Sequence, residues 1–418
     1  MKIQYVFLLI STVIIVFIDW FLAKQWKLIK FGNTFTGKKL AQFWFILIPG
    51  ISIIGFVISV FRIFWAEQPG VFLQVSWFFL IVLLIYLPKL VYAFFLFLDF
   101  LGERILDWIP KKEKNHHYPK ITRRKFMSQV GIIVATAPFF SLLFGVLKGR
   151  YAFYTRRVKL SFPNLPKEFE GLKIVQISDL HLGSFGANRE PLSEAVDLIN
   201  AEKPDVILFT GDIVNNFSGE LKGWESCFAP LKAPMGKFSI LGNHDYGNYS
   251  NWPSKEAKAK NFEEIVQGNK KLGFTLLRNQ NILLTRNGAS IGLAGVENWG
   301  LGRHPRKGDL LAATQGLEDQ PFNILMSHDP AHWDAKVLPQ DFYDLTLSGH
   351  THGMQFGLEK GNFRWSPAQY VNKRWAGLYR EGDKFLYVNR GLGYLGMPAR
   401  VGMPPEITVF ELHKGSII

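Results

Sequence analysis

The sequence predicts an α/β protein in two parts, a helical transmembrane region over residues 1–150 and an α/β domain over residues 151–418. Three observations carry this prediction. Long apolar runs fill the first part, and short apolar runs alternate with helical stretches in the second. In the second part, Asp, His or Asn follows nearly every short apolar run. The chain therefore combines a membrane anchor with a domain whose polar residues gather where strands end.

The composition of the chain excludes several classes of protein. Of its 418 residues, 48% are hydrophobic and 20% are charged, which is too apolar for a disordered chain. Cys227 is the only cysteine, so a secreted module held by internal disulfides is excluded. Of the net charge of +14, +12 belongs to residues 1–150, which hold 18 Lys and Arg against 6 Asp and Glu. Because this basic excess lies among apolar segments, no nucleic-acid partner is expected.

Four apolar stretches predict about four membrane spans. The stretches at 3–23, 43–65 and 71–101 are each long enough to cross about 30 Å of hydrocarbon as a helix. The fourth, at 130–147, is shorter and less apolar. Tryptophans, which favour the membrane interface, lie at or near the ends of the first three: Trp20, Trp44, Trp65 and Trp77. An integral membrane protein is therefore expected, with the lipid bilayer as a partner.

Basic residues in the loops predict the orientation of the chain. Five lysines lie between residues 24 and 39, and eight Lys or Arg lie between residues 104 and 125. By the positive-inside rule these loops face the cytoplasm. With four spans, the α/β domain then lies on the outer, extracytoplasmic face of the membrane. If stretch 130–147 does not span, the domain is cytoplasmic instead.

A pair of arginines bears on the same stretch. Arg123 and Arg124, followed by Phe126 and a moderately apolar run, resemble a twin-arginine export signal. A positively charged inner flank of a span is an equally good explanation. Both explanations place the domain outside, so the choice between a span and a signal at 130–147 stays open.

Six short apolar runs predict buried strands in the second part of the chain. They lie at 172–178, 206–210, 238–241, 291–296, 324–327 and 345–348. Helical stretches are expected at 191–201 and 255–272. Polar side chains at the carboxyl ends of successive strands meet at one edge of a sheet, so one site is expected there.

The residues that follow these strands are typical metal ligands. Asp179 and His181 follow the first run, and their i, i+2 spacing lets both side chains reach one ion. His350 and His352 repeat this spacing after the last run. The others, in chain order, are Asp212, Asn243, His244, Asp245 and His328. Carboxylate, imidazole and amide donors without a thiolate suit Mn, Fe or Zn.

Taken together, these motifs resemble those of a known family. The series Asp-Leu-His at 179–181, Gly-Asp at 211–212, Gly-Asn-His-Asp at 242–245, His328 and Gly-His-Thr-His at 349–352 is similar to the calcineurin-like metallophosphoesterase superfamily. The membrane anchor and the segments at 387–391 and 404–407 resemble its bacterial YkuE/YaeI-like phosphohydrolases. The resemblance covers about 173–352 and extends to 412. It implies a four-layer α/β/β/α sandwich, two sheets packed face to face, with a two-metal site at the sheet rim.

The resemblance implies seven ligands for two divalent metals, with Mn, Zn and Fe as the candidates. Three residues would hold the first metal, three would hold the second and one would bridge the two. In that order they are Asp179, His181 and His352; Asn243, His328 and His350; and Asp212.

Two further residues receive roles by the same resemblance. His244 would face the substrate phosphate as a general acid or transition-state stabiliser, and Asp245 would orient it. One position departs from the family pattern, because Asn215 stands where Gly-Asp-x-x-Asp has its last Asp. The departure concerns the tuning of the metals more than their binding.

The implied activity is hydrolysis of a phosphomonoester or phosphodiester by a metal-activated hydroxide. A membrane anchor near the site favours an envelope or lipid-linked substrate in a bacterial cell membrane. Arg390 and Arg400 lie on glycine-rich C-terminal loops and are weaker candidates to bind the substrate phosphate.

Two alternatives stay open. The first is a pyrophosphatase that acts on UDP-2,3-diacylglucosamine in lipid A synthesis, which requires a cytoplasmic domain. The predicted topology counts against it. The second is a non-catalytic membrane sensor with an inactive phosphoesterase-like domain. A degenerate domain loses ligands, whereas all seven ligand positions and His244 hold the expected residue types.

Several other residues carry weaker expectations. The pair at 297–298 follows an apolar run and is expected either at the sheet rim or in a turn. His304, His332 and His413 have no partner pattern and are expected at the surface or in the core. Cys227 is expected to be a small buried residue. The loop at 392–403 is apolar enough to form a wall near the membrane.

Overall fold

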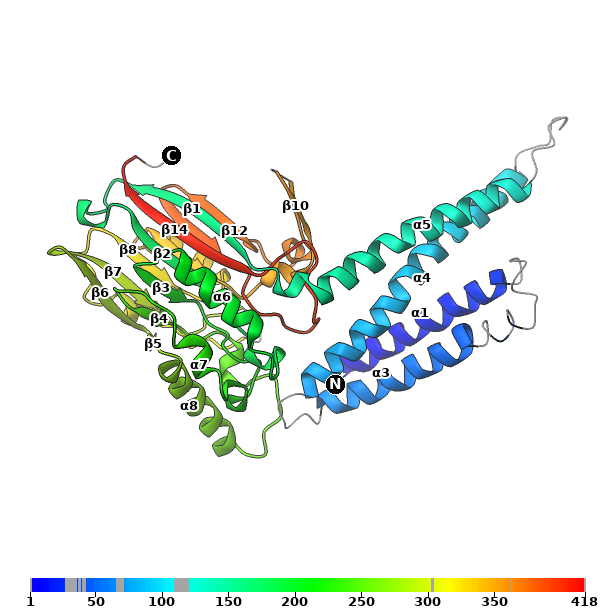
Figure 1. Ribbon diagram of the computed structural model, residues 1–418, viewed down its shortest axis with the longest axis horizontal. Helices are drawn as coiled ribbons and strands as arrows, with labels where there is room; N and C mark the ends of the chain where they lie inside the picture. Colours follow the sequence, from blue (N-terminus) through cyan, green and yellow to red (C-terminus); the bar gives the residue numbers. More distant parts are fainter. Residues whose placement is uncertain are drawn as a thin grey trace. The chain divides into compact units, whose positions relative to one another are not determined.

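A computed structural model describes residues 2–26, 36, 39, 43–64, 71–108, 120–301, 304–361 and 363–416. The chain forms a helical unit within residues 1–144 and an α/β unit that begins at residue 145 (Figure 1). Trp65, three of the five lysines between 24 and 39, and residues 109–119 of the basic segment lie outside the described residues.

The described residues of the helical unit form four long helical segments. They are α1 (Lys2–Trp26), the π-helical turn η2 (Phe43–Leu47) continued by α3 (Ile48–Phe64), α4 (Val71–Trp108) and α5 (Lys120–Leu147). Residues 74–105 and 125–151 form helices that are long and apolar enough to cross a membrane. The expected fourth stretch, 130–147, is thus part of a longer helix.

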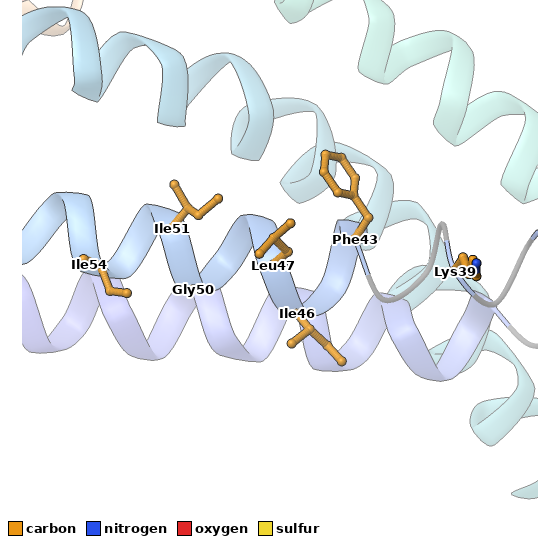
Figure 2. A pocket seen from close by; sticks show the side chains of 7 residues that line it. All are labelled: Lys39, Phe43, Ile46, Leu47, Gly50, Ile51 and Ile54. Carbon is orange, nitrogen blue, oxygen red and sulfur yellow. The ribbon is translucent and has the colours of Figure 1, made fainter.

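The surface of this unit is largely apolar. Figure 2 shows apolar side chains that stand out from η2 and α3 around a shallow groove. The residues that line the groove are Lys39, Phe43, Ile46, Leu47, Gly50, Ile51 and Ile54. Such a surface suits contact with acyl chains and does not suit contact with water.

Ionisable side chains inside the helical unit are paired with one another. The Lys89 ammonium lies 2.7 Å from Oδ1 of Asp19, and the Tyr86 hydroxyl donates to Oδ2 of Asp19 at 2.8 Å. Asp19 lies on α1, and the other two residues lie on α4. Because a charge inside a membrane is costly unless it is paired, this cluster links α1 to α4.

The α/β unit contains two six-stranded sheets. The first has the order β1-β14-β2-β3-β4-β5 and the second β12-β13-β9-β8-β7-β6. The first sheet consists of β1 (Tyr154–Phe162), β2 (Leu172–Ile177), β3 (Val206–Phe209), β4 (Lys237–Ser239), β5 (Thr275–Leu276) and β14 (Glu406–Lys414). The second consists of β6 (Gln280–Arg286), β7 (Ala289–Gly295), β8 (Asn323–Met326), β9 (Leu345–Ser348), β12 (Gly377–Glu381) and β13 (Lys384–Val388). A separate hairpin pairs β10 (Leu358–Lys360) with β11 (Phe363–Trp365).

The two sheets pack face to face, and helices cover their outer faces (Figure 1). Ile174 and Leu208 of the first sheet share one core with Ile324 and Leu347 of the second. The alternate residues of the first sheet pack on α6 (Glu190–Ala201), α7 (Glu225–Phe228) and α8 (Lys255–Lys271), and those of the second pack on α9 (Leu310–Thr314). Both faces of each central strand are buried, so these strands read as continuous apolar runs. The expected α/β/β/α sandwich is confirmed.

All six predicted strands are present, and their directions create the site edge. β2, β3 and β4 are parallel, and so are β7, β8 and β9, so within each set the carboxyl ends lie at the same edge of the sheet. β1 is not among the six predicted strands; it lies at the edge of its sheet and mixes charged with apolar residues. An edge strand needs no continuous apolar run, because it is only partly buried.

Candidate metal centre

The predicted ligands lie in the short loops that leave the strands. Five of them adopt left-handed backbone angles, with φ of 50° at Asp179, 44° at His181, 59° at Asp212, 74° at His350 and 51° at His352. Positive φ is costly for residues other than glycine and clusters at functional sites. The chain thus accepts local strain to turn these side chains toward one another.

Glycines let the ligand loops approach closely. A Cβ atom at Gly242 would collide with Oδ1 of Asp212, and one at Gly349 would collide with Oδ2 of Asp179. Any larger residue at either position would push a carboxylate out of the site.

The first group of ligand candidates is Asp179, His181 and His352, and all three are buried. The Nε2 atoms of the two histidines are 3.1 Å apart. Nε2 of His352 also lies 3.2 Å from Oδ1 of Asp179. Three donor atoms of this group therefore lie close enough together to hold one ion.

The second group contains Asp212, His328 and His350. The side-chain oxygen Oδ1 of Asn243 joins them, at 3.1 Å from Nε2 of His328 and 2.7 Å from Nδ1 of His350. The ring of His328 is fixed from behind, because its Nδ1–H donates to the carbonyl of Thr210 at 2.7 Å. Its Nε2 lone pair is thereby directed into the site.

Asp212 lies between the two groups. Its Oδ2 is 3.1 Å from Nε2 of His328 and 3.7 Å from Nε2 of His181. A carboxylate in this position can contribute a ligand to each of two ions. The buried donors are carboxylate, imidazole and amide oxygen, which fits hard or borderline divalent cations.

The charges of the ligand candidates also suit a cation. Burial raises the pKa of Asp212, but His328 and His244 hold that pKa well below its usual range. Burial lowers the pKa of His181 and brings that of His350 to about 4, so both imidazoles are neutral donors near pH 7. His328 differs, because Asp212 raises its pKa to about 10 against the effect of burial. An incoming cation must displace that proton, so metal binding should weaken at low pH.

His244 lies beside the ligands without joining either group. Its backbone N–H donates to Oδ1 of Asp212 at 2.8 Å, and its Nδ1 lies 2.7 Å from the carbonyl of Asn215. With Nδ1–H held by that carbonyl, Nε2 is the ring nitrogen left for a substrate. Asn215 thus supports His244 through its main chain, while its side chain bonds to Ser184.

The described contacts of the Asp245 carboxylate are with the backbone around the ligand candidates. Its carboxylate accepts the backbone N–H groups of Gly242 at 2.8 Å, Asp212 at 3.0 Å and Ile213 at 2.9 Å. It therefore holds the two ligand loops together, and the contact that orients the His244 ring comes from Asn215. The short turn His244–Tyr246 directs the adjacent side chains of 244 and 245 to different partners.

Arg390 and Arg400 do not fit the substrate-binding role expected for them. Both are fully buried. Arg390 is paired with Glu406 and Glu359. Arg400 donates to backbone carbonyls, among them those of residues 390, 391 and 403, and its Nη2 lies 3.2 Å from Nδ1 of His352. These two arginines therefore hold the C-terminal loops in place behind the site.

The structure also places the residues for which the sequence supported only weaker expectations. Glu297 pairs with Arg278 and accepts the Tyr246 hydroxyl, so it belongs to a structural network. His332 is buried against Trp299, His413 pairs with Glu170, and Cys227 is buried. The loop 392–403 forms no exposed apolar wall, because Leu392, Tyr394 and Met403 are buried.

Tyr249 and His304 belong to the site, although sequence reasoning missed both. Nδ2 of Asn243 donates to the Tyr249 hydroxyl at 2.8 Å, and this hydroxyl lies 2.7 Å from Nδ1 of His304. The Tyr249 ring also stacks on the His244 ring, with centroids 4.5 Å apart. The hydrogen-bond chain fixes the Asn243 amide so that its oxygen faces His328 and His350. The residues are 55 apart in sequence, so no local pattern joins them.

Removal of the Tyr249 hydroxyl should selectively weaken the second ligand group. In Tyr249→Phe the ring still stacks on His244, but the Asn243 amide loses its acceptor. We expect the affinity for the second metal equivalent to fall about 10–100-fold, with the first equivalent unchanged. Calorimetric titration of Mn²⁺ into the metal-free protein measures both equivalents. Tyr370→Phe, at an exposed position, is the control, and equal loss of both equivalents would contradict this role.

Glu220 supports the loop that holds His244 and should make stability depend on pH. Its carboxylate accepts the backbone N–H groups of Asn215 at 2.6 Å, Asn216 at 3.2 Å and Phe217 at 3.1 Å. Burial raises its pKa from the ordinary 4.5 to about 7, although these donors act to lower it. Because the folded pKa exceeds the unfolded one, the contribution to stability is full below about pH 4.5 and is lost as the pH rises through about 7.

The expected size of this effect is up to ~3 kcal/mol between those two pH values. In Glu220→Gln, the melting temperature should be lower at acidic pH and should fall less as the pH rises from 4.5 to 7 than it does in the parent. The exposed Glu194→Gln is the matched control. If the melting temperatures of the parent and of Glu220→Gln changed with pH in the same way, Glu220 would not titrate in this range.

Both parts of the chain match models of known protein families. Residues 172–354 match the family model described as calcineurin-like phosphoesterase. Residues 3–150 match a model described as a probable calcineurin-like phosphoesterase transmembrane domain. The helical unit is therefore a transmembrane region attached to a phosphoesterase domain.

Three relatives illustrate the similarity. The chain is 37% identical to the uncharacterized metallophosphoesterase YkuE of Bacillus subtilis, over 60% of this chain and 82% of the relative. It is 30% identical to a bovine transmembrane protein with metallophosphoesterase domain, over 61% of this chain and 56% of the relative. It is 27% identical to phosphodiesterase YaeI of Escherichia coli, over 70% of this chain and 99% of the relative. The chain thus spans little more than half of the bovine relative.

Proposed function

The chain belongs to the calcineurin-like phosphoesterase family of metal-dependent phosphohydrolases, and from this premise we propose a dinuclear enzyme anchored in the membrane. It hydrolyses a phosphomonoester or phosphodiester, and its substrate is linked to a lipid or belongs to the cell envelope. The observation that carries the proposal is the position of Asp212 between two groups of buried ligands, with His244 beside them.

Each group of side chains has a part in this reaction. Two bound metals supply Lewis acidity and a water of lowered pKa at the phosphorus. Asp179, His181 and His352 would hold one ion, Asn243, His328 and His350 would hold the other, and Asp212 would contribute to both. Mn, Zn or Fe fits this donor set.

His244 acts on the substrate directly in this proposal. Its Nδ1–H is held by the Asn215 carbonyl, so Nε2 faces the reacting phosphoryl group. As an imidazolium it donates a proton to the leaving oxygen or a hydrogen bond to a phosphoryl oxygen. Asp245 contributes indirectly, because it holds the backbone of residues 212–214 and 242 in one arrangement.

The anchor supports a substrate that resides in the membrane. A domain tied to the bilayer meets lipid-linked phosphates at a high local concentration. A relative named as a phosphodiesterase makes a diester the first substrate to test. A panel should contain a chromogenic monoester, a chromogenic diester, a long-chain lipid phosphate and UDP-2,3-diacylglucosamine.

The panel is run on the full-length protein in detergent with Mn²⁺, Zn²⁺ or a chelator. We expect metal-dependent turnover that chelation removes, with preference for the lipid phosphate. Preference for UDP-2,3-diacylglucosamine would favour the lipid A alternative. Stable binding of two metals without turnover on any substrate would favour the sensor.

We propose that the phosphoesterase domain lies on the outer face of the membrane. The support is the lysine-rich and arginine-rich character of the loops at 24–39 and 104–125. A reporter that is active only outside the cytoplasm, fused after Ile418, should be active. Activity of a cytoplasm-only reporter at the same position would reverse the assignment.

A further inference from the structure

The hairpin β10–β11 has an unusual distribution of side chains. It stands out from the α/β unit in Figure 1. Residues alternate along its strands, so that Leu358 and Lys360 share one face with Trp365 and Phe363 across the hairpin. Glu359 and Arg364 are paired on the other face.

The charged face of the hairpin is directed inward. Glu359 lies 3.0 Å from Nη2 of Arg156 and 2.8 Å from Nη2 of Arg390. Arg364 donates to the carbonyl of Ala376 and lies over the Trp375 ring, 5.0 Å from its centroid. A hairpin in water normally places its charged face outward and its apolar face on the core. Here the arrangement is reversed.

The apolar face is directed outward and extends beyond the hairpin. Leu358 is 55% exposed and Phe363 is 58% exposed. Phe356 lies edge-on to Trp365 with centroids 6.1 Å apart, and Trp365 Nε1 donates to the Tyr370 hydroxyl at 3.4 Å. We call this surface the hairpin face, defined as Phe356, Leu358, Phe363, Trp365, Tyr370 and Val371. A contiguous exposed apolar surface of this kind marks an interaction site.

Backbone hydrogen bonds join the base of the hairpin to the end of a candidate membrane span. The amide of Arg400 donates to the carbonyl of Gly145, in the last turn of α5, at 3.2 Å. The next residue, Val401, bonds in both directions to the hairpin base, with Gln355 at 2.8 Å and Gly357 at 2.9 Å. The stretch 125–151 that contains Gly145 is one of the two helices able to cross a membrane.

We propose that the hairpin face inserts into the lipid–water interface where α5 leaves the bilayer. The occupant is the bilayer and not a second protein, because the chain holds this face within a few hydrogen bonds of its own membrane span. The composition supports this choice, since Trp and Tyr favour the interface and the exposed Lys360 can reach lipid headgroups with its amine.

Docking of the hairpin face also affects the substrate. The hairpin begins directly after η10 (His352–Gln355), whose first residue is a ligand candidate. Insertion would hold the metal centre at the depth of lipid-linked phosphates. This second part of the inference rests on the proposed phosphoesterase function, whereas the docking itself does not.

A fluorescent label on the hairpin tests the docking. Phe363→Cys in the full-length protein is labelled with an environment-sensitive dye and reconstituted in nanodiscs of zwitterionic and anionic phospholipids. Leu311→Cys, equally labelled, is the control, because Leu311 is 75% exposed on α9. The native Cys227 is buried, so the parent chain serves as the labelling blank.

We expect lipids that carry a quencher to quench the dye at 363 and aqueous iodide to quench the dye at 311. Equal quenching of both labels by iodide would overturn the inference. So would protection of the dye at 363 from both quenchers, with the dye at 311 still quenched by iodide and a change in oligomeric state, which would assign the face to a second copy of the chain.

Negative charges on the hairpin face test whether docking raises activity on a lipid-linked substrate. In Leu358→Glu/Phe363→Glu, kcat/KM for a long-chain lipid phosphate should fall about tenfold, with no change for a water-soluble chromogenic phosphoester. Leu311→Glu should change neither value. An equal loss on both substrates would contradict a docking role. If the parent hydrolyses neither substrate, the proposed function fails, and the quenching result alone still decides whether the face docks.

Discussion

Replacement of Asp212 by Asn is expected to abolish hydrolysis and to reduce bound metal from two ions per chain to one or none. The Asp212 carboxylate lies near imidazoles of both groups, at 3.1 Å from Nε2 of His328 and 3.7 Å from Nε2 of His181. Asn retains the shape but removes the charge that compensates two cations. Loss of several kcal/mol of electrostatic stabilisation corresponds to a fall in kcat/KM of at least ~10³-fold.

The measurement combines turnover of a chromogenic phosphoester with metal analysis by mass spectrometry. Asp341→Asn is the matched control, because that side chain is 83% exposed and pairs with Lys384, which is not a ligand candidate. Both metal content and activity of the control should equal those of the parent. Retention of both metals and full activity in Asp212→Asn would remove the dinuclear assignment.

His244→Ala is expected to separate metal binding from catalysis. The His244 ring is held by Asn215 and Tyr249, and it belongs to neither group of ligand candidates, so both metals should remain bound. Without its proton donor, kcat should fall by ~10²–10⁴-fold. The two assays are the same as for Asp212→Asn.

The control for this substitution is His413→Ala, which removes a surface histidine paired with Glu170. It should leave metal content and kcat unchanged. If His244→Ala lost a metal ion, His244 would be a ligand. If it kept full turnover, another group would donate the proton.

The clustering of the ligand candidates could be predicted, because these residues follow the strands directly. Asp179, Asp212 and His328 each come just after an apolar run, and the parallel strands bring the ends of these runs to one edge. The positions of the strand ends in the sequence therefore predict most of the residues that meet at the candidate metal centre. The α/β/β/α layers could be predicted from the family resemblance and not from the runs alone.

The contacts behind the ligands could not be predicted, because they depend on the path of the backbone in space. Asp245 follows His244 in the sequence, yet a short turn directs its carboxylate to the N–H groups of residues 212–214. Arginine is a common phosphate ligand, but Arg400 is buried among backbone carbonyls that accept its hydrogen bonds. Burial of a long polar side chain is decided by its tertiary partners.

The exposure of the hairpin face could not be predicted from the sequence either. The alternation at 356–360 shows that one face of a strand is apolar, but it does not say which face meets the core. Only the pairing of Glu359 with Arg156 and Arg390 turns the charged face inward. The apolar loop at 392–403, which composition suggested as the exposed wall, is buried instead.

In the proposed mechanism two metal ions act together on a phosphoester, and a metal titration tests this joint action. Metal-free full-length protein receives increasing Mn²⁺, and turnover of a chromogenic phosphodiester is followed at each addition. We expect activity to rise steeply with the second equivalent, to saturate at two per chain and to be absent from Asp212→Asn. Full activity at one equivalent, or activity that persists in the presence of a chelator, would contradict this joint action.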